Sequence, residues 1–177
     1  DNFYKSLGFA NIRRTEWDDT EYGRVLQRED IDLLIDIGDK KDIKISEKLR
    51  QKNYGDVLLE VWSLYENEVP GWFVEGKSDL LCIFFRDYKN PQVAIINTQE
   101  LRAVYELFKD QITNSDWDYL IRTNKTRSVK RITVNGKAYD CTLVRAENET
   151  YNTMSVCVPF SMLESLEVRH NFCTFAM

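Results

Sequence analysis

The chain has 177 residues, of which 43% are hydrophobic and 30% are charged, and its formal net charge is −5. A length and composition of this kind are typical of one soluble globular domain with a real core, and they exclude a disordered chain. The negative net charge argues against a broad nucleic-acid-binding surface, and no apolar run approaches the roughly 20 residues of a membrane helix.

Strands and short helices alternate along the predicted chain. In order, we expect helices over 3–8 and from Asp18 or Asp19 to about Arg28, strands over 31–37, 43–50, 56–63, 78–85 and 92–97, a helix over 99–109, a hairpin over 132–139, a strand over 154–158 and a helix over 161–166. Lys89-Asn90-Pro91 would link the fourth and fifth strands, and Asn135-Gly136 marks the later hairpin. The pattern predicts an α+β fold in one domain, 1–177, with a mixed central β-sheet flanked by helices and an added C-terminal hairpin.

The third predicted strand, 56–63, is almost continuously apolar. Such a run is typical of a strand that is covered on both faces, so we expect it at the centre of the sheet.

The cysteines Cys82, Cys141, Cys157 and Cys173 are widely spaced and form no CxxC pair. Buried free thiols are their usual state, and the single His170 offers little support for a structural zinc site. The N-terminal stretch lacks the basic and then apolar layout of a signal peptide. We therefore expect a reduced, cytoplasmic protein without membrane association.

Acidic and basic residues accompany two neighbouring predicted strands. Asp32 opens the first strand, and Ser46-Glu47-Lys48 lies near the end of the second. Carboxylates can hold a divalent cation such as Mg²⁺ or Mn²⁺, and a nearby lysine can orient water or neutralise the charge of a phosphate. We therefore predict that Asp32 and Glu47 bind metal and that Lys48 and Glu47 are catalytic.

Further acids, one on a strand and two on a helix, are candidates for the same metal. Glu60 lies within the apolar third strand, where an unpaired charge would be costly to bury. Glu21 is the best acid on a helix, with Glu16 second. A plainer interpretation makes both helix acids surface residues, treats Asp32 as a strand-edge acid and places Glu47 in a salt bridge.

A basic segment stands out in the C-terminal half. Between Leu120 and Arg145 an excess of six positive charges comes from Arg122, Lys125, Arg127, Lys130, Arg131, Lys137 and Arg145, set against Asp140. A phosphate backbone would be drawn to such a segment, although a solvated hairpin is an equal alternative. The predicted nucleic-acid contacts are Arg50, Arg127, Lys130, Arg131 and Lys137.

A series of short motifs follows in one order over residues 31–101. They are Ile31-Asp32, Glu47-Lys48-Leu49-Arg50, Gly55-Asp56 with Glu60 and Ser63, Pro70-Gly71-Trp72, Ser78-Asp79-Leu80 and Gln99-Glu100-Leu101. In this series the chain resembles the PD-(D/E)XK, or restriction-endonuclease-like, nuclease superfamily, and within it uncharacterised phage and mobile-element proteins. The resemblance implies a nuclease core over about 16–110 with a basic extension over about 120–158. It also implies divalent-metal-dependent hydrolysis of DNA.

One position departs from that superfamily pattern. Ser46 stands where the pattern has an acid two residues before the lysine. Side chains alternate along a strand, so Ser46 shares a face with Lys48 while Glu47 points the opposite way. Either a bulge brings Glu47 into the role, or Glu60 takes it, or the site is inactive.

These alternatives lead to three functions. The first is an active nuclease, and the second is a degenerate relative that binds nucleic acid or a protein partner. The third is an interaction module whose charges are incidental. The sequence leaves the oligomeric state open.

Overall fold

The computed structural model describes residues 1–86 and 92–174 of the chain. The chain forms two compact units with one β-sheet each. The first unit comprises Asp1–Asn53, Gly76–Gln99 and Arg169–Met177, and the second comprises Tyr54–Glu75 and Glu100–Val168. The predicted α+β class is confirmed, with one mixed and one antiparallel sheet flanked by helices. The division into a single domain stays a prediction.

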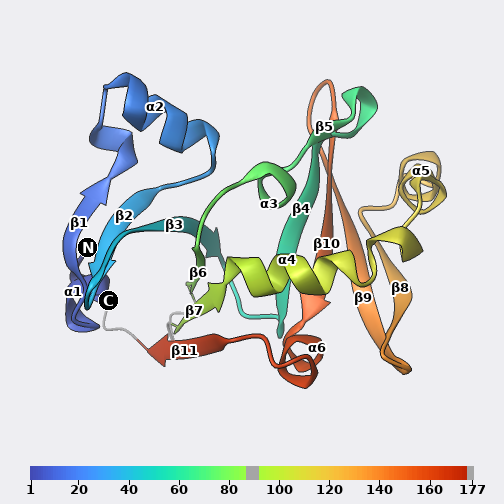
Figure 1. Ribbon diagram of the computed structural model, residues 1–177. Coiled ribbons are helices and arrows are strands. Elements are labelled where there is room, and N and C mark those ends of the chain that lie inside the picture. Colours follow the sequence, from blue (N-terminus) through green and yellow to red (C-terminus); the bar gives the residue numbers. More distant parts are fainter. Residues whose placement is uncertain (87–91, 175–177) are drawn as a thin grey trace. The chain divides into compact units, whose positions relative to one another are not determined.

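The first unit contains the mixed sheet (Figure 1). Its elements are α1 (Asn2–Ser6), β1 (Ala10–Arg14), the 3₁₀ helix η1 (Thr15–Trp17), α2 (Glu21–Arg28), β2 (Leu33–Ile37), β3 (Lys40–Arg50), β6 (Leu80–Phe85), β7 (Gln92–Asn97) and β11 (His170–Thr174). The strand order is β1-β2-β3-β6-β7-β11, in which β3 and β6 run parallel and the other neighbours antiparallel. The predicted turn at Lys89–Pro91 lies outside the described residues.

The two faces of this sheet carry different sets of side chains. Leu33 pairs with Ile45, and both pack with Tyr4 of α1 in one buried cluster. Leu34 pairs with Lys44 and packs instead with Leu26 of α2. Since cross-strand partners point to the same face, even-numbered side chains of β3 share the face of Leu34, and odd-numbered ones share the face of Tyr4.

The N-terminus of α2 corrects one prediction. Thr20, rather than Asp18 or Asp19, is the N-cap, and its side chain accepts a hydrogen bond from the backbone N–H of Gly23 at 3.1 Å. A Cβ at Gly23 would lie 2.2 Å from the carbonyl oxygen of Asp18, so only glycine fits there. The predicted end of the helix at Arg28 is confirmed.

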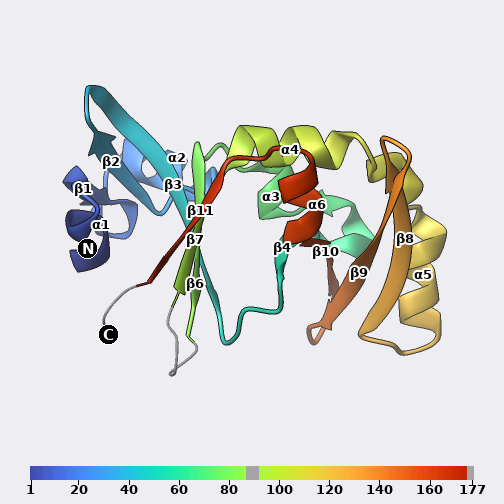
Figure 2. The same ribbon diagram turned by 90° about the horizontal axis from the view of Figure 1, so that it is seen from below.

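The second unit contains the antiparallel sheet, in the order β5-β4-β10-β9-β8. Its elements are β4 (Asp56–Leu64), η2 (Tyr65–Asn67), β5 (Val69–Pro70), α3 (Trp72–Glu75), α4 (Thr98–Glu106, whose first two residues belong to the first unit), η3 (Lys109–Gln111), α5 (Asn114–Arg122), β8 (Arg127–Val134), β9 (Lys137–Glu147), β10 (Asn152–Pro159) and α6 (Phe160–Ser165). The Asn135-Gly136 hairpin between β8 and β9 is confirmed, and Figure 2 shows α5 alongside it. Both turn residues have positive φ, 50° and 76°, as a type I′ turn requires.

The predicted central position of the 56–63 strand is wrong. This strand is β4, which pairs with β5 and β10 of the antiparallel sheet and not with β3. Val57, Leu59 and Val61 are buried, whereas Glu60 and Trp62 are half-buried. Buried and half-buried residues thus alternate along β4. Only one face of this strand packs against the core, and the apolar residues on its other face are partly covered.

Arg145 of β9 is a structural residue and is only 4% exposed. Its guanidinium donates to the carbonyl oxygens of Leu120 and Ile121, both at 3.4 Å, and to Asn124 Oδ1 at 2.9 Å. It also pairs with Glu147 at 2.5 Å. Arg145 therefore holds the C-terminal end of α5 against β9 and is not available to a phosphate backbone.

Replacing Arg145 by alanine should lower the free energy of unfolding by about 3 kcal/mol, because the last carbonyls of α5 and Glu147 lose a buried cation. Arg131→Ala is the matched control, since Arg131 is 73% exposed and lies 3.8 Å from Asp140. That change should cost at most about 0.5 kcal/mol. Urea unfolding measures both, and equal losses would contradict the structural role.

Among the residues that the structure describes, no helix is long and apolar enough to cross a bilayer.

Candidate active site

The central part of β3 is regular, which decides where the motif side chains point. Residues 45–50 pair one by one with 80–85 of β6, without a register shift. Ser46 and Lys48 therefore lie on one face and Glu47 on the other. The first alternative for the missing acid, a bulge that turns Glu47 towards Lys48, is excluded.

Asp30 lies on the face of Ser46 and Lys48. Ser46 Oγ donates to Asp30 Oδ2 at 2.5 Å, and Lys48 Nζ donates to Asp30 Oδ1 at 2.6 Å. Ser46 is fully buried, while the side chains of Asp30 and Lys48 are 22% and 26% exposed. The Asp30 carboxylate thus stands directly over Ser46, where a longer acidic side chain at position 46 would project. An acid and a lysine meet on this face of β3, but the acid comes from another segment.

The end of α2 carries Asp30 to this position. The N–H of Asp30 donates to Gln27 O at 3.1 Å, and that of Ile31 donates to Leu26 O at 3.0 Å. Asp30 has a φ of 57°, in the left-handed region that aspartate tolerates better than most residues. Ile31 is 1% exposed, so its burial fixes the reversal that points Asp30 towards β3.

Asp32 lies beside the same cluster. Its Oδ2 accepts a hydrogen bond from the backbone N–H of Glu47 at 2.6 Å, and its own N–H donates to Ile45 O at 2.8 Å. Burial raises the pKa of Asp32 above its ordinary value, and the charges of Asp30 and Glu47 add to the rise. The Glu47 N–H and the charge of Lys48 oppose it. Asp30, Asp32 and Lys48 are therefore within electrostatic reach of one another.

Glu47 belongs to a second cluster, on the opposite face of β3. Tyr4 OH donates to its Oε1 at 2.7 Å, and Arg14 NH1 donates to its Oε2 at 2.6 Å. Burial raises the pKa of the Tyr4 phenol, and the charge of Glu47 and its hydrogen bond raise it further, so Tyr4 stays a donor. These contacts favour the salt-bridge interpretation of Glu47 over its predicted role as a metal ligand.

A cavity of about 310 Å³ opens beside Glu47 in the first unit. Its lining includes the polar side chains of Arg14, Glu47 and Lys48 and the rings of Phe3, Tyr4 and Phe84. Lys48 therefore borders this cavity as well as the Asp30 cluster.

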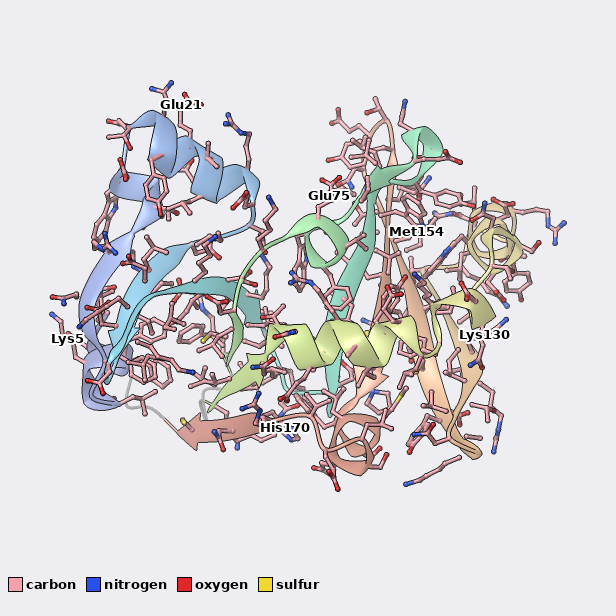
Figure 3. The ribbon with its side chains drawn as sticks, in the orientation of Figure 1. Lys5, Glu21, Glu75, Lys130, Met154 and His170 are labelled. Atoms are coloured by element: carbon pink, nitrogen blue, oxygen red, sulfur yellow. The ribbon has the colours of Figure 1, made fainter. Side chains whose placement is uncertain are left out.

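The remaining candidate acids have partners of their own. Glu60 belongs to β4 of the second unit, where its Oε1 accepts from Ser63 Oγ at 2.9 Å and from the N–H of Trp72 at 3.4 Å. Glu21 is labelled on α2 in Figure 3, its side chain 76% exposed and 3.3 Å from Arg28. Glu21 is thus a surface residue, as the plainer interpretation of the sequence has it.

The predicted nucleic-acid contacts differ in how exposed they are. Arg127 and Arg131 are exposed and lie on the same face of β8, the edge strand of the antiparallel sheet. Lys137 is also exposed, with its Nζ 5.1 Å from the centroid of the Tyr139 ring. The edge of this sheet therefore presents several cations to solvent.

Two members of the predicted contact set are less accessible. Lys130 is half-buried on the other face of β8 and donates to both carboxylate oxygens of Asp116, at 2.8 and 2.9 Å (Figure 3). Arg50 is half-buried at the end of β3, where its carbonyl oxygen accepts from the N–H of Arg86 at 2.8 Å.

Asp30 is the site residue that sequence reasoning missed. The sequence feature that could have identified Asp30 is its position just past the end of an amphipathic helix. An aspartate there can take a positive φ, and the chain then turns away from the helix axis.

Within residues 1–86 and 92–174, no three or more histidine, cysteine, aspartate or glutamate side chains are grouped so as to hold a metal ion. Comparisons with protein-family models, curated proteins and solved structures give no match to this chain. Any assignment of function therefore rests on the contacts of the site.

Asp32→Asn should raise the free energy of unfolding at pH 7. Burial raises the pKa of Asp32, so its ionised form costs stability in the folded state, whereas a neutral amide can still accept from the Glu47 N–H. The gain should shrink as the pH falls through the raised pKa towards the value in the unfolded chain. Urea unfolding between pH 3.5 and 8 measures this change.

Asp36→Asn on β2 is the matched control with the opposite sign. Hydrogen bonds from Asn11 and from the N–H of Asp42 hold the pKa of Asp36 below its ordinary value. Its ionised form therefore stabilises the fold above the unfolded pKa, and the amide should lower stability at pH 7. If Asp32→Asn lowers the free energy of unfolding as Asp36→Asn does, the ionised Asp32 does not destabilise the folded state.

Proposed function

We propose that the chain is a divalent-metal-dependent nuclease that hydrolyses DNA phosphodiesters. In this proposal the first unit is a restriction-endonuclease-like core in which Asp30 replaces the acid expected at position 46. The observation that carries it is the double contact of the Asp30 carboxylate, which accepts from Ser46 and from Lys48 on one face of β3.

The side chains of the cluster fit a hard cation. Asp30 and Asp32 supply carboxylate oxygens, which Mg²⁺ and Mn²⁺ prefer, and Mg²⁺ often needs only one or two carboxylates because it keeps several waters and takes substrate oxygens. The raised pKa of Asp32 supports the assignment, since an acid that is held half-buried at a cost to stability is typical of a functional site.

Each side chain would have one task. Asp30 and Asp32 would hold the cation, which when bound supplies charge stabilisation at the phosphate and lowers the pKa of a water. Lys48 would donate a hydrogen bond to a non-bridging phosphate oxygen and neutralise charge that develops there. Ser46 would orient Asp30 through the hydrogen bond to Oδ2.

Purified protein should cleave plasmid or single-stranded DNA in Mg²⁺ or Mn²⁺. Lys48→Ala, Asp32→Ala and Asp30→Asn should each lower the rate by about 100-fold or more, since each removes a charge at the phosphate or the cation. Gel-based cleavage rates at saturating metal measure this effect.

Two variants test which acid is used. Glu21→Gln removes an exposed carboxylate and should leave the rate within about twofold of the unchanged protein. Glu47→Gln keeps the shape of a side chain that Tyr4 and Arg14 hold on the other face, and it should cost far less than Asp30→Asn. Full activity in Asp30→Asn would refute the role of Asp30.

The alternative is a relative that binds nucleic acid without cleaving it. A specific observation favours it, since Lys48 already neutralises Asp30 and Arg14 already neutralises Glu47. In that case the exposed cations of the β8 edge would hold a phosphate backbone without any metal.

The double variant Arg127→Ala/Arg131→Ala should weaken DNA binding equally across sequences. Two lost phosphate contacts should lower the slope of log affinity against log salt by about 2, because each contact releases close to one counterion. Lys5→Ala removes an exposed cation from α1 of the first unit and is the control (Figure 3). Fluorescence anisotropy at several salt concentrations measures the slope, and an unchanged slope in the double variant would exclude the β8 edge as the contact surface.

A further inference from the structure

A second cavity, of about 190 Å³, lies within the second unit. It is lined by Trp62, Tyr65, Glu66, Glu68 and Asn114. These residues come from the end of β4, from η2 and the residue that follows it, and from the start of α5. Neither the candidate active site nor the basic edge of β8 uses any of them.

Two aromatic rings form walls of this cavity. The ring centroids of Trp62 and Tyr65 are 6.4 Å apart, and the ring planes are inclined at 69°. The single proton of the Tyr65 hydroxyl is donated to Asp118 Oδ1 at 2.9 Å, with Asn114 O as a second acceptor at 3.3 Å, which fixes the ring against α5. The two inclined rings form a corner of the cavity. Because Tyr65 is already held in place, a small ligand group can enter this corner without a change in the Tyr65 conformation.

The surroundings of the cavity are negative. Glu66 and Glu68 are exposed members of its lining. Burial, then Asp118 and then these two glutamates, raises the pKa of Tyr65 to about 12. The Glu66 carboxylate accepts hydrogen bonds from the N–H of Asn152 at 3.0 Å and from the Asn152 side-chain amide. Burial opposes the change, but these hydrogen bonds and then the charge of the buried Arg145 lower the pKa of Glu66, and Arg145 is itself paired with Glu147. Two glutamates thus line the cavity, and a third carboxylate, that of Asp118, contacts the Tyr65 hydroxyl.

We propose that this cavity binds an alkylammonium cation, either free or as the head group of a lysine side chain. Ring faces attract a cation that lies within about 6 Å of their centroids, and carboxylates at the rim add attraction that a neutral group of the same shape does not receive. Because the observations come from other residues, this site does not depend on the proposed nuclease activity.

Choline and its neutral isostere 3,3-dimethyl-1-butanol test the proposal on the whole chain at constant ionic strength. The four tryptophans give four indole N–H signals in a ¹H–¹⁵N NMR spectrum. Choline should shift the Trp62 signal in a saturable way and leave that of Trp17, which is 72% exposed, unchanged. The isostere should not shift it. Equal shifts with both compounds, or none with either, would overturn the proposal.

Variants separate the two kinds of contact. Glu68→Gln removes one exposed charge without touching the rings, and it should weaken choline binding about two- to fivefold. Tyr65→Leu should weaken it at least as much, whereas Tyr65→Phe keeps the ring and should retain binding. Retention of full affinity in both Glu68→Gln and Tyr65→Leu would refute the site.

A peptide that contains trimethyl-lysine identifies the source of the cation. Tighter binding of the peptide than of choline would show that the cavity takes a side chain of a protein partner. Equal or weaker binding would assign it to a free amine.

Discussion

The alternation of side chains along β3 is the constraint on which the rest of the site depends. Regular pairing with β6 sends Ser46 and Lys48 to one face of β3 and Glu47 to the other, so the acid and the lysine of the sequence motif point in opposite directions. The acid that contacts Ser46 and Lys48 is Asp30, because a reversal after α2 brings its carboxylate to that face. The adjacent acid Glu47 instead contacts Tyr4 and Arg14 on the opposite face.

Three charged residues that the fold covers wholly or in part differ in how well their charges are matched. Arg145 is buried and Glu47 is half-buried, and each has partners of opposite charge or hydrogen-bond partners from other elements. Arg145 contacts Asn124 and Glu147, and Glu47 contacts Arg14. Asp32 is different, because burial outweighs the contacts that favour its charge and leaves its pKa raised. A group that the fold holds at a cost is a better candidate for chemistry than one that the fold uses for stability.

Local patterns predicted much of the fold. The strand over 92–97 has the bounds of β7, and the Asn135-Gly136 turn was sufficient to predict the β8–β9 hairpin. The α5 helix was not predicted, although Thr113 and Asp116 form a capping box at its start. The edge strands β1 and β11 were also missed, because their short and partly exposed segments lack a clear apolar period.

Non-local choices could not be predicted in the same way. The residues of 56–63 do not determine whether this strand pairs with β10 or with β3, because an apolar strand fits either sheet. The place of Asp30 depends on the burial of Ile31 and on a positive φ, which only the packing of α2 fixes. Ser46 could be recognised as a departure from the superfamily pattern, but the Asp30 carboxylate that it contacts lies sixteen residues earlier in the chain.

The most direct test of the account is a titration with Mn²⁺ followed by NMR, because this paramagnetic ion broadens the signals of nuclei close to it. We expect selective loss of the backbone amide signals of Asp30, Asp32 and Ser46, and no such loss in the Asp30→Asn variant. Broadening that persists in this variant, or that centres on Glu60 or Glu21, would contradict the central claim that Asp30 supplies the missing acid.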